Sequence, residues 1–398
     1  MRQPFNRSRY RRCRRPAAAA LVKIDDDDDG PPISDGNYGV LPADVLYDIL
    51  LRLPANHLCR LRLVCRSWRS LTSDPFFAKD HSRRRPHVIA LRQQRQDELH
   101  VIDLRDRIIV KTIQIAQPGA RLLAELDLVC VEYPHFLAWG GACVLNLQQG
   151  TGSAAIADIT ADHQVLRCSS SLMAPSYILG HVPSTGEYKM FCLYDVLAGY
   201  QAPNSKEQIC HVMTLGSSTG RRWREAQDAP VLLAKSMAVV SGVVYFLVDH
   251  YQYCSDSVAS FDLATEEWRS TILQGPVQPS TKDGMFRLVE LADCLVMVHC
   301  NIKDSIMDLW YIEDTSKSLW TKRFSIQWTT IADFQSIGHV APLMVSDGGR
   351  IVFWVPERGI IGAYDPKTSS WINLVRMGDH FAVAMHQGSL LCSGLKVY

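Results

Sequence analysis

The pattern nearest to a catalytic signature in this 398-residue sequence is Gly216-Ser217-Ser218-Thr219-Gly220, which matches GxSxG. A nucleophile elbow of that kind needs a strand, a strained turn and a helix, so that the serine projects from the turn. Here the pentapeptide stands between HVMTL and RRWRE, two runs of strand character. The context predicts a hairpin loop, and we do not expect Ser218 to act as a nucleophile.

The histidines and cysteines do not form a recognisable catalytic or metal-binding motif either. The thirteen His are scattered, with no HExxH and no Cys/His finger spacing, and the twelve Cys include no CxxC. The nearest cysteine pairs, Cys59/Cys65 and Cys294/Cys300, do not have the spacing of a zinc site. No GxGxxG or GxxxxGK[ST] run occurs for a nucleotide. We therefore expect no enzyme, no metal, no cofactor and few or no disulfides.

Composition and charge set broad limits on the class of protein. Hydrophobic residues make up 47% and charged residues 21%, and 42 Lys+Arg stand against 41 Asp+Glu, a formal charge of +1. That balance is globular and does not favour binding to nucleic acid. A membrane-spanning helix needs about 20 apolar residues, and the run 236–248 is too short.

Residues 1–39 read as a disordered leader. Seven Arg precede a short apolar patch, and an acidic run (25–29) and a turn-rich stretch follow. The patch is too short for a secretory signal, so we expect a cytoplasmic or nuclear protein, not a secreted one. Arg11–Arg15 is either a nuclear-import signal or solvated tail, and an organelle transit peptide is a further alternative.

Residues 40–85 predict a small three-helix unit. Val45, Ile49 and Leu53 lie on one stripe of a first helix that Pro54 ends. Asn56 is a candidate N-cap for a second helix that runs to Leu71, and Asp74-Pro75 begins a third short turn. So many large apolar residues on so small a unit imply that one face packs on another protein.

The text of this unit, LPADVLYDILLRLP followed by LCRLRLVCRSWRSLTSDPFF, resembles the F-box of plant F-box proteins. The resemblance implies docking on the Skp-type adaptor of an SCF (Skp, cullin, F-box) ubiquitin ligase. The family's common Lys after the Val-Cys pair is Arg66 here, which keeps the charge. The residues at the family's positions, of which some face the adaptor and others only hold the helices together, are Leu41, Pro42, Val45, Ile49, Leu50, Leu53, Pro54, Leu61, Val64, Cys65, Trp68 and Leu71.

Residues 86–398 predict a large all-β domain. Short β-rich runs alternate with Gly, Asp, Ser and Pro turns, and a turn followed by an aromatic residue recurs. The aromatics are Tyr188, Trp223, Trp268, Trp320 and Trp371, and the four tryptophans are spaced by 45, 52 and 51 residues. That period is typical of four-stranded propeller blades of the kelch class, so we expect about six blades, with tryptophans sealing the gaps between them.

The β-rich part also resembles the F-box-associated β-propeller domain of plants, in segments such as YILGHVPSTGEYKM and VASFDLATEEW. The final run FAVAMHQGSLLCSG is expected to close the ring beside residues 86–91. The blade signatures of the first 60 residues of the domain are faint.

Together these features predict the substrate-recognition adaptor of an SCF-type ubiquitin ligase, a chain that breaks no covalent bond itself. The helical unit would hold the adaptor and, through it, a cullin, while the propeller holds an unknown target protein. One alternative is a propeller that binds a ligand or sugar, or acts as an enzyme, with the helical segment accessory. Another is a nucleic-acid-bound regulator that uses the Arg-rich leader.

Overall fold

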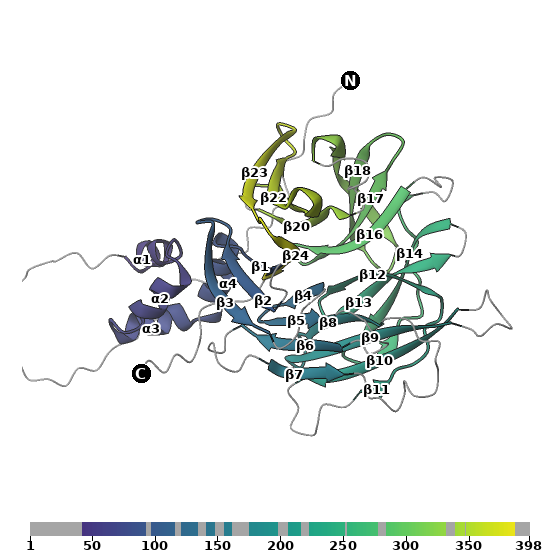
Figure 1. The fold of residues 1–398 in the computed structure, drawn as a ribbon, viewed down its shortest axis with the longest axis horizontal. Coiled ribbons are helices and arrows are strands. Elements are labelled where there is room, and N and C mark those ends of the chain that lie inside the picture. The colour runs from purple at the N-terminus through teal and green to yellow at the C-terminus, as the bar shows by residue number, and fades with distance from the viewer. Residues whose placement is uncertain are drawn as a thin grey trace, which may run out of the picture. The chain divides into compact units, whose positions relative to one another are not determined.

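A computed structural model describes residues 42–92, 97–115, 121–133, 141–147, 155–160, 175–197, 206–215, 223–250, 253–277, 284–331, 339–346 and 348–386. Four short helices come first, and β-strands follow to the end of the described chain (Figure 1). The predicted leader, Leu41 and the GxSxG pentapeptide lie outside the described residues. No described helix has the length and apolar character needed to cross a membrane.

The helical segment comprises α1 (Ala43–Leu50), α2 (Ala55–Leu61), α3 (Arg66–Ser73) and α4 (Pro75–Arg84). Its small core contains fully buried side chains from three of the four helices and from the turn after α1, namely Leu50, Leu51, Ala55, Leu58 and Phe77. Half-buried apolar residues such as Trp68 and Leu71 pack around them. Burial of this set stabilises helices that are each too short to persist alone in water.

The second helix expected from the sequence is divided into α2 and α3, so the segment has four helices where three were predicted. Pro54, not Asn56, is the N-cap of α2, and Cys65 adopts an extended conformation (φ −156°, ψ 168°) before α3. The guanidinium of Arg62 donates to Thr72 at Oγ1 (3.2 Å) and at the backbone oxygen (2.7 Å). These hydrogen bonds join the turn after α2 to the last turn of α3 and so stabilise the break between the two helices. The helical periodicity of the sequence does not reveal this break.

The β domain consists of six four-stranded antiparallel sheets, the blades of a propeller, which confirms the predicted fold. Blade 1 contains β24 (His380–His386), β1 (His87–Arg92), β2 (Glu98–Asp103) and β3 (Ile108–Gln114); blade 2, β4 (Arg121–Glu125), β5 (Leu128–Glu132), β6 (Gly141–Asn146) and β7 (Ala155–Thr160); blade 3, β8 (Ser176–Val182), β9 (Glu187–Leu197), β10 (Lys206–Leu215) and β11 (Arg224–Glu225).

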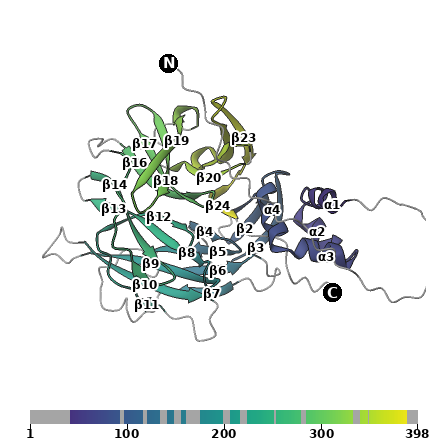
Figure 2. The same ribbon diagram turned by 180° about the vertical axis from the view of Figure 1, so that it is seen from behind.

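The last three blades follow the same plan. Blade 4 contains β12 (Leu233–Val240), β13 (Val243–His250), β14 (Tyr253–Asp262) and β15 (Glu267–Trp268); blade 5, β16 (Gly284–Leu291), β17 (Cys294–Asn301), β18 (Ile306–Asp314) and β19 (Leu319–Gln327); blade 6, β20 (Ala341–Val345), β21 (Ile351–Val355), β22 (Ile360–Asp365) and β23 (Ser370–Arg376). Short 3-10 turns lie at Trp328–Thr330 and Pro356–Arg358. Figures 1 and 2 show the first strand of each sheet toward the middle of the ring.

The ring closes as the sequence predicted, with a late strand in the first sheet. β24 pairs antiparallel with β1, and His386 stands opposite His87. Tight turns join the inner strands to their neighbours; in blade 4, Ser241 and Gly242 both have positive φ (51° and 79°). Such a pair of angles gives the two-residue hairpin turn whose twist matches the strands.

The four periodic tryptophans lie in the fourth strand of blades 4 to 6 and immediately before it in blade 3, and each packs in the apolar layer shared with the preceding blade. Trp268 contacts Phe191 of blade 3 and Phe261 of its own blade, with ring centroids 6.1 and 5.1 Å apart. The predicted sealing role is therefore confirmed. Tyr188 differs, because it lies near the start of a second strand, β9, and is not equivalent to the tryptophans.

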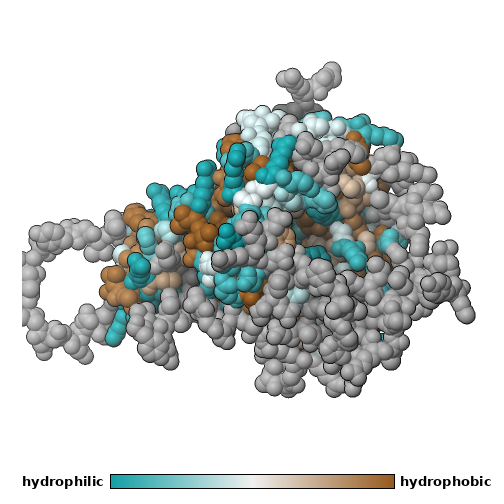
Figure 3. Space-filling view, in the orientation of Figure 1, coloured by the Kyte–Doolittle hydropathy of each residue, from teal (hydrophilic) through white to brown (hydrophobic). Residues whose placement is uncertain are grey.

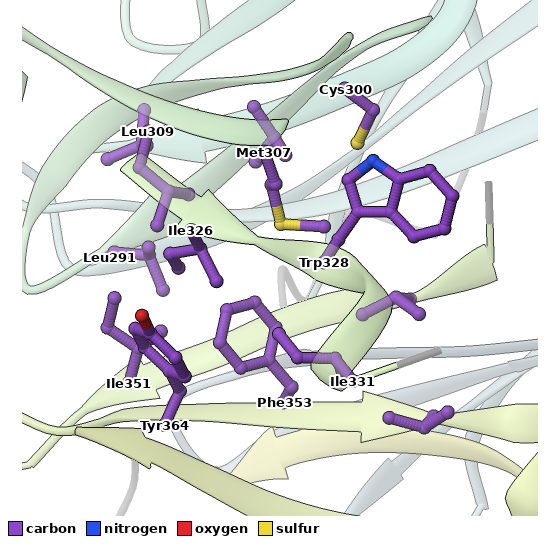
Figure 4. Packing of buried hydrophobic residues seen from close by; sticks show 14 of the residues in the cluster. Leu291, Cys300, Met307, Leu309, Ile326, Trp328, Ile331, Ile351, Phe353 and Tyr364 are labelled. Atoms are coloured by element: carbon purple, nitrogen blue, oxygen red, sulfur yellow. The ribbon is translucent and has the colours of Figure 1, made fainter. Parts of the chain in front are cut away.

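Figure 4 shows one of these layers, between blades 5 and 6. Met307, Ile326 and Phe353 are fully buried there, and Trp328 covers one side. The interiors of the strands are apolar on both faces because each blade is covered by a neighbour on both sides.

Candidate protein-docking site

The twelve residues that the sequence assigned to the adaptor fall into different classes of exposure. Leu50 is buried and belongs to the helical core, and Leu41 lies outside the described residues. Five are half-buried, namely Leu53, Pro54, Leu61, Trp68 and Leu71. Five are exposed, namely Pro42, Val45, Ile49, Val64 and Cys65. The structure thus separates side chains that a partner can reach from side chains that hold the helices together.

Helix α1 presents Val45 and Ile49 to solvent. They are 40% and 42% exposed and stand four residues apart, so they lie on the same face. Leu50, the residue after Ile49, faces the core and is only 1% exposed. The apolar stripe predicted for this helix therefore contains more side chains than the helical core buries, and Val45 and Ile49 at its edge remain exposed to solvent.

The link between α2 and α3 presents a second pair, Leu63 and Val64, each 63% exposed. The Arg62–Thr72 hydrogen bonds hold this link, and Arg69 Nε donates to the backbone oxygen of Arg62 (3.2 Å). Sequence reasoning missed Leu63, because its helical periodicity was interrupted at an unrecognised break.

Phe76 is the most exposed large apolar side chain, at 76%, and sequence reasoning did not select it either. Asp74 positions it as the N-cap of α4, where its carboxylate accepts from the amide of Phe76 at 2.6 Å. The neighbouring Phe77 points into the core instead, with its ring 5.1 Å from Tyr47. The signal available in the sequence was the pair of adjacent phenylalanines, Phe76 and Phe77, of which the structure exposes one ring and buries the other.

Polar contacts fix the edges of the helical segment. Tyr47 donates to Asp80 (2.9 Å) and Arg84 pairs with Asp48 (3.2 Å), joining α1 to α4. Burial, and then the hydrogen bond with Asp80, raise the pKa of Tyr47 well above its usual range. The hydrogen bond with Ser67 lowers the pKa of the exposed thiol of Cys65. Figure 3 shows brown, apolar residues gathered at the surface over α1 to α3.

Within the described part of the chain, nothing resembles a metal centre: no group of three or more His, Cys, Asp or Glu is placed to hold an ion. Cys210 and Cys300 are present as thiols, and burial raises the pKa of each. The chemistry that the helical segment offers is an apolar surface.

Comparison with known families supports this interpretation. Residues 163–380 match a family described as the F-box associated beta propeller domain, which is more than half of the chain. Residues 38–84 match a family described as F-box-like, the range that contains all four helices.

Known proteins with similar sequences come from Arabidopsis thaliana. An F-box protein is 26% identical over 92% of this chain and 95% of its own length. An F-box/kelch-repeat protein is 26% identical over 77% of this chain and 83% of its own. A solved protein from Lactobacillus plantarum covers 76% of this chain at 10% identity, with a TM-score of 0.43. The family matches show that the chain belongs to the F-box proteins of the plant type that carry an F-box associated β-propeller.

Proposed function

We propose that this chain is the substrate-recognition subunit of an SCF-type ubiquitin ligase, with helices α1–α4 docked on a Skp-type adaptor. The observation that carries the proposal is the exposed apolar surface of the F-box-like segment, formed by Val45, Ile49, Leu63, Val64 and Phe76. Large apolar side chains left in water on a small module mark a protein interface. The adaptor would in turn connect the chain to a cullin.

The propeller is proposed to hold the protein that is ubiquitinated. Its sheets form a rigid scaffold whose connections are free to vary, and binding residues are concentrated on such connections. The mechanism is proximity: a tethered target meets the ubiquitin-carrying enzyme at a high effective concentration. This chain needs no catalytic residue for that step.

The alternative of an enzyme or sugar-binding propeller is not favoured. One family match covers the helical segment (38–84) and a second covers most of the propeller (163–380), so both parts belong to a family architecture in which they occur together. We therefore treat the helical segment as an essential part of the function.

The experiment measures the affinity of the full chain for a Skp-type adaptor by calorimetry, with two double variants. Val45→Ser with Ile49→Ser removes apolar surface from α1, and Ile108→Ser with Ile109→Ser removes matched surface from β3, where these residues are 48% and 51% exposed. We expect the α1 variant to bind at least about 30-fold more weakly, the loss of about 2 kcal/mol typical of a hot spot. The β3 variant should bind normally.

Thermal melting of both variants provides the fold control, because all four positions are exposed. Leu50 is unsuitable, since truncating a fully buried leucine costs about 2–5 kcal/mol of stability and would confuse unfolding with lost binding. Equal affinity of the two variants for the adaptor, with intact folds, would refute the proposed docking surface.

We also propose that the protein works in the cytoplasm, the nucleus or both. The support is the Arg11–Arg15 cluster, whose run of basic residues is typical of nuclear-import signals. A fluorescent fusion in plant cells, with and without glutamine at the arginines of that cluster, tests this. A fusion found in the secretory pathway would exclude it.

A further inference from the structure

Three cations from three different blades lie on strands around the ring axis: Arg121 is the first residue of β4, Lys235 the third of β12 and Arg287 the fourth of β16. All three strands are the inner strands of their sheets, and β12 and β16 are in contact. Leu288 donates its amide to Ser236 at 2.9 Å, so Arg287 and Lys235 lie on adjoining backbone. We call these three residues the cationic mouth.

The charges of these residues also influence the pKa of neighbouring groups. Burial lowers the pKa of Arg287, and the charge of Arg121 adds to that effect from across the ring. Arg121 and Lys235 both act on the carboxyl group of Glu132 at the end of β5.

The carboxylate partners of Arg121 and Lys235 have largely buried side chains. Arg121 lies 3.7 Å from Glu132 and Lys235 lies 3.9 Å from Asp195, distances of ion pairs without a hydrogen bond. The side chains of Arg121 and Lys235 are 45% and 52% exposed, whereas those of Glu132 and Asp195 are 12% and 13% exposed. Within the described part of the chain, the positive member of each of these two pairs is therefore the more exposed one.

The same carboxylates are also weak partners. Asp195 accepts from the amide of Gln208 at 2.8 Å, and burial raises the pKa of Glu132 in spite of the two cations beside it. Among the described residues, no hydrogen bond is donated by the side chains of Arg121 or Lys235. Their N–H groups are available to an incoming anion.

The opposite end of the inner strands carries the negative charges of Glu290 and Asp293, at the end of β16. Glu125 ends β4 at the same end of the ring, and these two charges help burial to raise its pKa. The chain also enters the propeller at that end, because His87 pairs with His386, the last residue of β24. The cationic mouth thus lies on the face remote from the entry of the chain from α4.

We propose that the cationic mouth binds an acidic segment of the target protein, one that carries carboxylate or phosphate groups. The proposal rests on the proposed function, in which the propeller holds the target. A protein segment fits better than nucleic acid, because the cations are arranged around the ring axis on three inner strands instead of following a track along which a phosphate backbone lies. Charge complementarity of this kind selects partners and speeds their association.

Fluorescence anisotropy of labelled peptides on the full chain tests the proposal. The probes are a ten-residue polyglutamate and a ten-residue peptide of alternating phosphoserine and glycine, which distinguish carboxylate from phosphate. Arg121→Gln with Lys235→Gln removes two charges from the cationic mouth, and Lys317→Gln with Lys367→Gln removes two exposed charges from turns at the other face. All chains carry glutamine at the arginines 11, 12, 14 and 15, so that the leader does not dominate binding.

We expect the mouth variant to bind at least one peptide about 10-fold more weakly than its parent, and the control variant to bind within about 2-fold of it. Equal affinity of the two variants would overturn the proposal. So would tighter binding of a ten-residue oligothymidine that is lost in the mouth variant, because the site would then be one for nucleic acid. Melting temperatures and adaptor affinity are measured on the same chains; lost adaptor binding counts against the proposed function, not against the mouth.

Discussion

Arg85 and Asp103 form a buried ion pair at the point where the helical segment becomes the first blade. Arg85 Nε and Nη2 lie 3.0 and 2.8 Å from the same carboxylate oxygen of Asp103, and the two side chains are 3% and 1% exposed. Nη1 of Arg85 donates to the backbone oxygen of Arg52 (2.8 Å), and Asp106 accepts from the same guanidinium. One side chain therefore joins the turn after α1 to the turn between β2 and β3.

Breaking this pair from either side should destabilise the fold strongly. Asp103→Asn leaves the charge of Arg85 buried with only the half-exposed Asp106 as an anionic partner, and such losses cost about 3–5 kcal/mol. Urea denaturation measures the change. Asp106→Asn is the control and should cost about 1 kcal/mol or less, because its side chain is 39% exposed. Similar costs for the two variants would contradict this view of the pair.

The buried His87, which lies beside Asp103, should make the free energy of unfolding fall in mild acid. Burial lowers the pKa of His87 to about 4 from the ordinary value of 6.5, in spite of the charge of Asp103. Between pH 6.5 and 4 the unfolded chain binds a proton that the folded chain excludes, so the stability present above pH 6.5 is lost as the pH falls. The contribution of His87 is about 3 kcal/mol.

The measurement is the free energy of unfolding at several pH values in that window. His87→Gln should reduce its slope with pH, whatever the variant does to stability at pH 7. His339→Gln, at a side chain that is 68% exposed, serves as control and should keep the slope of the parent. An unchanged slope in His87→Gln would show that other groups account for the acid sensitivity.

Glu125 predicts the opposite trend toward alkaline pH. Burial, assisted by the charges of Glu290 and Asp293, raises the pKa of its carboxyl group to about 8. A raised pKa means that stability is fully present below about pH 4.5 and declines as the pH rises toward 8.

Glu125→Gln should therefore stabilise the chain at pH 8 by at least about 1 kcal/mol and do little at pH 5. The amide oxygen of Gln keeps an acceptor for the backbone N–H of His181, which lies 3.4 Å from Glu125 Oε1. Denaturation at the two pH values checks this, and a variant that is destabilised equally at both would refute it.

Close packing between strands of blade 6 predicts a large effect of one methyl group. A Cβ atom at Gly362 would overlap the ring of Trp371 on the adjacent strand. Gly362→Ala should cost about 1–3 kcal/mol in chemical denaturation, because the tryptophan has to move out of its layer. Gly348→Ala is the matched control: a Cβ there meets nothing within 4 Å, so its stability should stay within about 1 kcal/mol.

The propeller was predictable because its repeat is carried by a residue type that is hard to replace. A tryptophan occupies an equivalent position in each of four successive blades and packs in the layer between that blade and the preceding one, as Trp223, Trp268, Trp320 and Trp371 show. The repeat of the fold is therefore visible in the sequence as a regular spacing of tryptophans. The first two blades lack that mark, which is why their signatures were faint in the sequence.

The division of the helical segment into core and surface was not predictable in the same way. Ile49 and Leu50 are neighbours of similar character, yet one is 42% exposed and the other 1%. Their exposure depends on tertiary packing: Leu50 joins the core formed with Leu58 of α2 and Phe77 of α4, and Ile49 does not. The cationic mouth was equally hidden, because Arg121, Lys235 and Arg287 are far apart in the sequence.

Because β1 pairs with β24, blade 1 stays incomplete until the last strand of the propeller has been synthesised. Synthesis proceeds from the N-terminus, so the helical segment emerges complete while β1 still has one edge without its partner. An open strand edge is a template for pairing with the wrong chain. The nascent protein therefore completes its helical segment before its propeller has closed, and a chain released before residues 380–386 retains that segment without a finished blade 1.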